Sequence, residues 1–174
     1  VGAGCDFVER NERGSAWAIG LDIPVVGYGQ HEGAIVPGFG LEAALHLHPM
    51  FDFLVHGDIV VMPRGDDERA LHQTVLAGGR IDFSHHPQPG DVKGVFATLG
   101  AGYDRVAAPS SAAVQSGPIV EGSVAWGLQG SDGAAWLRLH GRFGVGPDNS
   151  DLRAVFLSLG MEIRLDRNRW RDRN

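Results

Sequence analysis

The stretch Ala154-Val-Phe-Leu-Ser-Leu-Gly-Met-Glu-Ile-Arg-Leu165 alternates between two kinds of residue. One parity is entirely apolar and contains Val155, Leu157, Leu159, Met161, Ile163 and Leu165. The other parity carries the charges, Glu162 and Arg164, together with Ser158 and Gly160. Because successive side chains of a β-strand point to opposite faces, the stretch predicts a strand with one apolar and one charged face.

Seven further stretches follow the same pattern, at residues 16–27, 36–48, 52–62, 73–84, 94–104, 118–129 and 135–145. In all eight the charged residues keep to one parity. Each stretch exceeds the usual soluble strand of about 5–6 residues. Each also reaches the roughly 9–11 residues that a tilted strand needs to cross a bilayer. The pattern therefore predicts an all-β protein with eight long, two-faced strands.

Composition narrows the class of protein. The chain has 174 residues, which corresponds to one domain with a sizeable core. It contains no run of 18 apolar residues, which excludes a transmembrane helix but not a membrane-spanning sheet. The net charge of −6 argues against nucleic acid as a partner. A single cysteine, Cys5, excludes an internal disulfide framework.

Two architectures fit eight two-faced strands. A soluble barrel would bury the apolar face and bind an apolar ligand, whereas a membrane barrel would turn this face to lipid. Three features favour the membrane barrel. The charged parity is rich in Gly, Ala and Ser, which a narrow lumen needs. Lys93 is the only lysine. Aromatic residues of the apolar parity gather near the two ends of the strands, as interfacial girdles do, with Trp126 as an exception.

The connections between the strands point the same way. Four of them, 28–35, 63–72, 105–117 and 146–153, are polar and long, whereas 49–51 and 130–134 are short. The connection at 85–93 is an exception. Long loops at one end and short turns at the other are typical of outer-membrane barrels.

On this pattern the chain resembles the small eight-stranded outer-membrane barrels of Gram-negative bacteria, of the OmpA transmembrane-domain and OmpX type. The resemblance covers about residues 15–166 and is sharpest in the last strand. There Ser158, Gly160, Ile163 and Leu165 match the spacing of the signal by which such barrels are recognised for assembly. The chain departs from the signal because Leu165 replaces the usual aromatic residue and residues 166–174 follow it.

The charged parity predicts a side-chain-filled lumen rather than an open pore, since eight strands enclose little space. Acidic residues outnumber arginines there, so the carboxylates need partners. We expect an interior network of Asp22, Glu42, Asp58, Arg80, Asp82, Asp104, Glu121, Arg138, His140, Arg142, Glu162 and Arg164. We expect no cofactor; His46, His48 and His56 are weak candidates for a metal site, because their spacing is not a specific signature.

An enzyme remains an alternative, because some small barrels modify outer-leaflet lipid with a histidine, a serine and a carboxylate. Ser84, His85 and His86 supply such residue types, as do Asp104 and the pair Ser110–Ser111. No spacing among them predicts a shared site.

We therefore predict an eight-stranded antiparallel up-and-down transmembrane β-barrel in a bacterial outer membrane. A polar N-terminal arm at 1–14 precedes the barrel at 15–166, and an Arg-rich tail at 167–174 follows it. The expected role is structural or partner-binding. The expected partners are outer-membrane lipid and lipopolysaccharide, and another envelope protein contacted through the loops or the tail.

Overall fold

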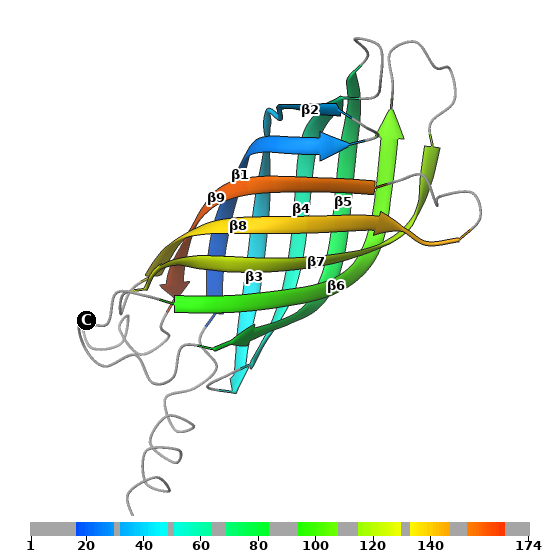
Figure 1. Cartoon of the computed structure of the whole chain (residues 1–174). Coiled ribbons are helices and arrows are strands. Elements are labelled where there is room, and N and C mark those ends of the chain that lie inside the picture. Colours follow the sequence, from blue (N-terminus) through cyan, green and yellow to red (C-terminus); the bar gives the residue numbers. More distant parts are fainter. Residues whose placement is uncertain are drawn as a thin grey trace, which may run out of the picture.

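The computed structural model describes residues 17–29, 32–48, 51–63, 69–83, 94–107, 115–129, 133–146 and 153–165. They form one closed antiparallel sheet (Figure 1). Its strands are β1 (Trp17–Gly29), β2 (Glu32–Ile35), β3 (Gly38–His48), β4 (Phe51–Pro63), β5 (Arg69–Asp82), β6 (Gly94–Ala107), β7 (Gln115–Gln129), β8 (Gly133–Gly144) and β9 (Arg153–Leu165). The predicted N-terminal arm and Arg-rich tail lie outside the described residues.

The sheet closes because β9 returns to pair with β1, with Leu165 opposite Trp17. From β3 to β9, each strand pairs with the next strand along the chain. The short strand β2 pairs only with the end of β1, and β3 pairs with the beginning of β1. Strands β2 and β3 thus lie end to end and together occupy one of the eight strand positions of the barrel. The predicted eight-stranded antiparallel up-and-down barrel is confirmed.

Two prolines interrupt the first hairpin, where the sequence predicted a loop at 28–35. The pairing of β1 with β9 shifts register between Pro24 and Val26. Opposite this bulge, the Val36 amide donates to the Val25 carbonyl at 3.1 Å, and Pro37 follows. A bulge adds one residue to a strand and reverses its alternation. The loop prediction was wrong because β1 and β2 continue beyond the point where the alternation breaks.

Two of the other long loops, predicted at 63–72 and 105–117, are shorter than predicted. Strand β5 begins at Arg69 and β6 ends at Ala107, so both extend into the expected loops. The longest connection between described strands is at the opposite rim, between Phe83 and Gly94. The expected contrast between long loops and short turns is therefore weaker than the sequence suggested, because the strands are longer.

The two faces of the sheet have inverted polarity. Large apolar side chains cover the outside, with Leu99 70% exposed and Val75 63% exposed. Charged side chains fill the inside, where Arg138 and Arg142 are each 2% exposed. This confirms the predicted orientation. The soluble-barrel alternative is wrong, because the apolar face points outward and leaves no apolar lumen for a ligand. Among the described residues, no helix is long and apolar enough to cross a membrane.

Exposed aromatic side chains form two groups at the ends of the strands. Trp17, Phe53 and Phe83 lie toward the rim that carries both ends of the described chain. Phe39, Tyr103 and Phe143 lie toward the other rim. Trp126, which did not fit the girdles in the sequence, is 55% exposed and pairs with Val95 near the beginning of β6. It therefore belongs to the first group, and the outer face has the aromatic belts of a bilayer-spanning barrel.

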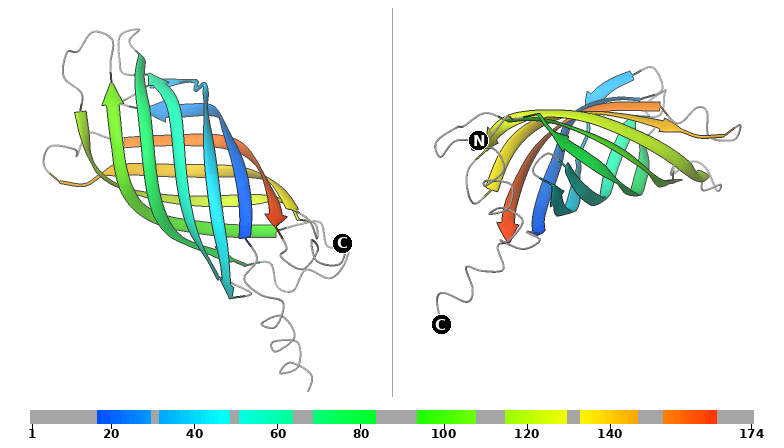
Figure 2. Two further views of the ribbon diagram at one scale, coloured as in Figure 1. Left: turned by 180° about the vertical axis from the view of Figure 1, so that it is seen from behind. Right: turned by 90° about the horizontal axis from the view of Figure 1, so that it is seen from below.

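The strands coil strongly around the lumen (Figure 2), and small residues allow this close approach. A Cβ atom added at Gly102 would lie 2.6 Å from the Cα atom of Leu76 on the neighbouring strand. At Gly127 it would lie 2.6 Å from the Cα atom of Trp136. Real Cβ atoms are not found this close to another backbone, so only glycine fits at these two crossings.

Candidate functional site: the charged interior

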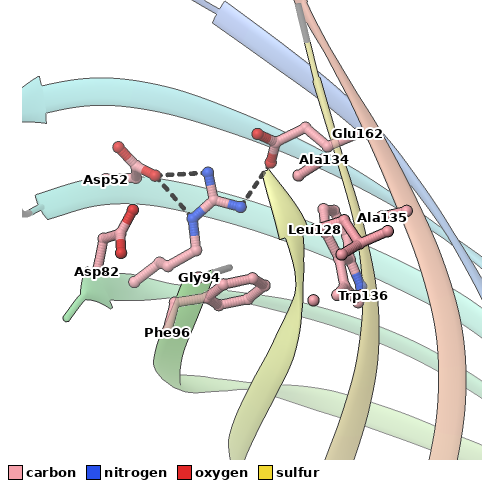
Figure 3. Close-up of a pocket in the computed structure, with 11 residues that line it drawn as sticks. Asp52, Asp82, Gly94, Phe96, Leu128, Ala134, Ala135, Trp136 and Glu162 are labelled. Carbon is pink, nitrogen blue, oxygen red and sulfur yellow. Dashed lines mark hydrogen bonds and ion pairs between the residues drawn. The ribbon is translucent and has the colours of Figure 1, made fainter. Parts of the chain in front are cut away.

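The lumen near the rim with both chain ends is organised around Arg80 of β5. Its Nε and Nη2 atoms contact Oδ2 of Asp52 at 2.7 and 2.5 Å. Its Nη1 atom donates to Oε2 of Glu162 at 2.5 Å and to Oε1 of Glu42 at 3.4 Å. Figure 3 shows the guanidinium between Asp52 and Glu162, which come from β4 and β9. One arginine therefore ties three strands to β5.

The next layer is built on Arg138 of β8. Its Nη1 atom donates to Oε2 of Glu42 at 2.8 Å, and its Nη2 atom lies 3.4 Å from Oε1 of the same carboxylate. Glu42 thus joins Arg138 to Arg80. The guanidinium of Arg138 also lies over the rings of Phe96 and Trp136, at 5.3 and 5.0 Å from their centroids. Cation–π contacts of this kind are favourable in a desolvated site.

The half of the lumen toward the opposite rim is organised around Arg142 of β8. Its Nε and Nη2 atoms donate to Oε2 of Glu121 at 2.8 and 2.6 Å. Its Nη1 and Nη2 atoms donate to the two oxygens of Asp58 at 3.3 and 2.5 Å, and Nη1 also donates to Oγ1 of Thr74 at 2.7 Å. The planar fork of arginine suits such multiple binding of carboxylates.

Three histidines supply further contacts to the carboxylates. Nδ1 of His140 lies 2.9 Å from Oε1 of Glu121, and its Nε2 lies 3.0 Å from Oδ2 of Asp22. Nε2 of His56 lies 3.1 Å from Oδ2 of Asp58. Nδ1 of His72 lies 2.8 Å from Oδ2 of Asp104. Because both ring nitrogens of His140 face carboxylates, the geometry is best satisfied when both carry a proton.

Ten of the twelve residues predicted for the interior network are buried inside the barrel. They are Asp22, Glu42, Asp58, Arg80, Asp104, Glu121, Arg138, His140, Arg142 and Glu162. Asp82 is half-buried and lines the mouth of the barrel. The side chain of Arg164 lies outside the described part of the structure.

The predicted interior network did not include Asp52, although Asp52 lies on the charged parity, nor His72, Thr74, Phe96, Trp136 and Phe156, which all take part in the network. His72 and Thr74 lie at the end of β5 that the sequence assigned to a loop or its edge. The three aromatic residues stand on the charged parity of their strands. An apolar residue on a charged face was the available signal, because such a ring must pack inside the lumen.

The predicted assembly residues divide between the two faces of β9. Ser158 is fully buried, and its Oγ lies 2.8 Å from Nε2 of His140. Gly160 lies under the indole of Trp136, so closely that an added Cβ would overlap the ring. Ile163 and Leu165 point outward and are 61% and 44% exposed. Whatever their role in assembly, Ser158 and Gly160 also pack inside the finished barrel.

Ser158, His140 and Glu121 have the order of contacts found in a catalytic triad: hydroxyl, imidazole, carboxylate. Their surroundings do not suit catalysis. Ser158 is 0% exposed and His140 1%, so a substrate carbonyl could not reach the hydroxyl in the closed barrel. The carboxylate of Asp22 also contacts Nε2 of His140, the same ring nitrogen that contacts the hydroxyl of Ser158. These contacts cross-link β1, β7, β8 and β9 rather than form an active site.

Of the residues considered for a lipid-modifying enzyme, the structure describes only Asp104. Asp104 is 1% exposed and is held inside the lumen by His72 and Thr74. Ser84, His85, His86, Ser110 and Ser111 themselves lie outside the described residues.

Of the metal candidates, His56 belongs to the ion-pair network with Asp58, and the side chains of His46 and His48 are not described. Within the described ranges, no group of three or more His, Cys, Asp or Glu side chains is arranged to hold a metal ion.

The mouth of the barrel, at the rim that carries both ends of the described chain, forms a pocket (Figure 3). Three acidic residues, Asp52, Asp82 and Glu162, line this pocket together with the basic residue Arg80. Phe96 and Trp136 form its apolar wall and pack edge to face, with centroids 5.4 Å apart. The ring of Phe96 contacts both guanidinium groups, with its centroid 5.1 Å from the Cζ atom of Arg80 and 5.3 Å from that of Arg138.

No protein family matches the sequence, and no curated protein matches it either. Solved structures do match the fold. The Neisserial surface protein A aligns with a TM-score of 0.68 and 10% identity, over 87% of this chain and 99% of that chain. The N-terminal barrel of Pseudomonas aeruginosa OprF gives 0.59 and 11%, over 86% and 97%. Ail of Yersinia pestis, solved with the heparin analogue sucrose octasulfate, gives 0.55 and 12%, over 87% and 97%.

At these identities the likeness concerns the fold. The closed barrel, the charged lumen and the apolar outer face with its aromatic belts define a small transmembrane β-barrel of the outer-membrane kind. The predicted class and the predicted outer-membrane location are confirmed.

Proposed function

We propose that this protein is a closed outer-membrane barrel with a structural or partner-binding role, and that it does not conduct solutes. Two ion pairs that span the whole lumen carry the proposal. With β2 and β3 counted as one of eight strand positions, β5 and β9 lie four positions apart in either direction around the barrel, so they face each other across the lumen. The same holds for β4 and β8. Arg80 and Glu162 join the first pair of strands at 2.5 Å, and Arg142 and Asp58 join the second at 2.5 Å.

These two links cross the lumen at different heights, and Glu42 and Arg138 fill the space between them. A dehydrated ion would have to separate buried pairs to pass, which is costly in a lumen of low dielectric. The barrel wall therefore serves as a rigid support. Contacts with a partner fall to the loops and the Arg-rich residues 167–174. The chain leaves β9 toward that segment at Leu165, on the rim where short turns join β3 to β4 and β7 to β8. Such short turns are periplasmic in outer-membrane barrels, although this rim also carries the longer connection between Phe83 and Gly94.

Conductance tests the closed lumen. We expect the wild-type barrel in a planar bilayer to show no steady conductance. The fourfold variant Asp58→Ser, Arg80→Ser, Arg142→Ser and Glu162→Ser removes both crossing links without changing the net charge, and we expect it to open. Heat-modifiable migration on a detergent gel shows whether each variant is folded. A steady conductance of the folded wild type would overturn the proposal. A folded but closed fourfold variant would show that other side chains close the lumen.

A further inference from the structure

Among the side chains that the structure describes, the exposed charges are all of one sign. Of the charged side chains whose exposure the structure describes, only Arg69 and Arg105 are exposed, although the whole chain carries a net charge of −6. The described carboxylates are buried in the lumen or, for Asp82, half-buried at its mouth. Among the described side chains, charge on the exterior is therefore confined to a small cationic area on an otherwise largely apolar surface.

The two arginines stand on neighbouring strands at the rim away from the chain ends. Arg105 of β6 pairs with Gln73 of β5, and its Nη1 atom donates to Oε1 of Gln73 at 3.0 Å. This hydrogen bond holds the guanidinium against the outer wall. Arg69 lies four residues beyond Gln73 on the same face of β5, about 13 Å along the strand. On the other side, exposed Ser116 of β7 pairs with Arg105. We call Arg69, Gln73 and Arg105 the outer polar patch.

Directly below the patch, on the same strands, the surface is apolar. Val75 and Tyr103 pair with each other and are 63% and 54% exposed, and Leu99 lies further down. The patch is also one-sided, because Phe39, Ile59 and Phe143 continue the apolar surface toward this rim on β3, β4 and β8. An occupant that matches both parts must carry apolar chains beside Leu99 and Val75 and an anionic group beside the arginines. That is the shape of an anionic lipid.

We propose that the outer polar patch binds the phosphorylated headgroup of an outer-leaflet lipopolysaccharide, with its acyl chains along β5 and β6. Arginine binds phosphate through two parallel N–H donors, and Arg105 is already oriented by Gln73. The separation of Arg69 and Arg105 along the barrel suits a headgroup with more than one phosphate. The inference rests on the membrane placement of the barrel but not on its closed lumen.

Binding of purified lipid A to the folded protein in a zwitterionic detergent, followed by native mass spectrometry, tests the site. We expect wild-type protein to retain lipid A, and added salt to weaken the binding because exposed charges are screened. Arg69→Gln and Arg105→Gln should each weaken binding about tenfold, since a charge-assisted hydrogen bond to phosphate is lost. Gln73→Glu, which adds a negative charge beside Arg105, should weaken it as well. Arg105→Lys should give an intermediate loss, because the charge stays and the fork is lost.

Ser116→Ala is the matched control, since it changes an exposed polar side chain beside the patch without removing a charge, and its binding should equal that of wild type. Lipid A binding that the double variant Arg69→Gln, Arg105→Gln retains at wild-type strength would overturn the proposal. So would equal retention of phosphatidylcholine by the wild type. Displacement of lipid A by millimolar inorganic phosphate would show a phosphate site without lipid specificity and would also count against it. Both arginine variants should keep the closed lumen and the heat-modifiable migration, so a failure here is distinct from a conducting barrel.

Discussion

Replacing Arg142 by methionine is expected to lower the free energy of unfolding by about 3–5 kcal/mol, the usual cost of removing one member of a buried ion-pair cluster. The reason is the position of the guanidinium, which binds Asp58 and Glu121 together. Methionine fills part of the space but leaves both carboxylates buried without their cation. Urea unfolding in phospholipid vesicles, read as the loss of the folded band on an unheated gel, measures the change.

Arg105→Met is the matched control, because it removes an exposed arginine from the outer wall. Its effect on stability should stay within about 0.5 kcal/mol. Adding Asp58→Asn and Glu121→Gln to Arg142→Met should recover much of the lost stability, since the buried negative charges are then gone. If Arg142→Met unfolds at the same urea concentration as the wild type, the crossing ion pairs do not hold the barrel together, and their proposed role as a plug loses its support.

The second large effect is expected at Gly160, where alanine should destabilise the barrel by about 1–3 kcal/mol through overpacking. An alanine Cβ would overlap Nε1 and Cε2 of the Trp136 indole. The ring has little room to retreat, because it packs edge to face on Phe96 and lies 3.5 Å from the position of a Cβ at Gly20. Folding from urea into detergent micelles, which contain no assembly machinery, measures packing alone.

Gly122→Ala provides the control, because the nearest atom to its new Cβ would be 3.9 Å away. Adding Trp136→Leu to Gly160→Ala should restore part of the loss, since the smaller side chain makes room. If Gly160 matters only as a signal to the assembly machinery, Gly160→Ala will fold in vitro as well as wild type and Trp136→Leu will bring no gain. That result would remove the packing role assigned to this glycine.

The sequence did not correctly predict where the strands end. The prediction followed apolar alternation, which ends where the outer face becomes polar. Arg69, Gln73 and Arg105 therefore appeared to belong to loops or their edges, although the hydrogen-bonded ladder of β5 and β6 includes all three. Backbone pairing does not depend on whether lipid or water faces the side chains. For this reason the sequence did not identify the residues of the proposed lipid site as part of the barrel wall.

The sequence also could not predict which side chains contact one another inside the lumen. The charged parity identified the residues that point inward, and the excess of carboxylates predicted that arginines must hold them. It could not show that Arg142 of β8 meets Asp58, 84 residues away. That contact depends on how far each strand is staggered against the next around the whole closed barrel.

The sequence by itself determined that eight strands each have an apolar and a charged face. Because Gly, Ala and Ser accompany the charges, it also determined which face is crowded and therefore inside. Both are local properties, since they follow from the period of the strand and the size of the side chains. Only the tertiary structure decided that Leu165 lies opposite Trp17, and hence which charges meet across the lumen. Closure of the sheet into a barrel fixes the position of all strands along the barrel axis together. No single stretch of sequence contains that information.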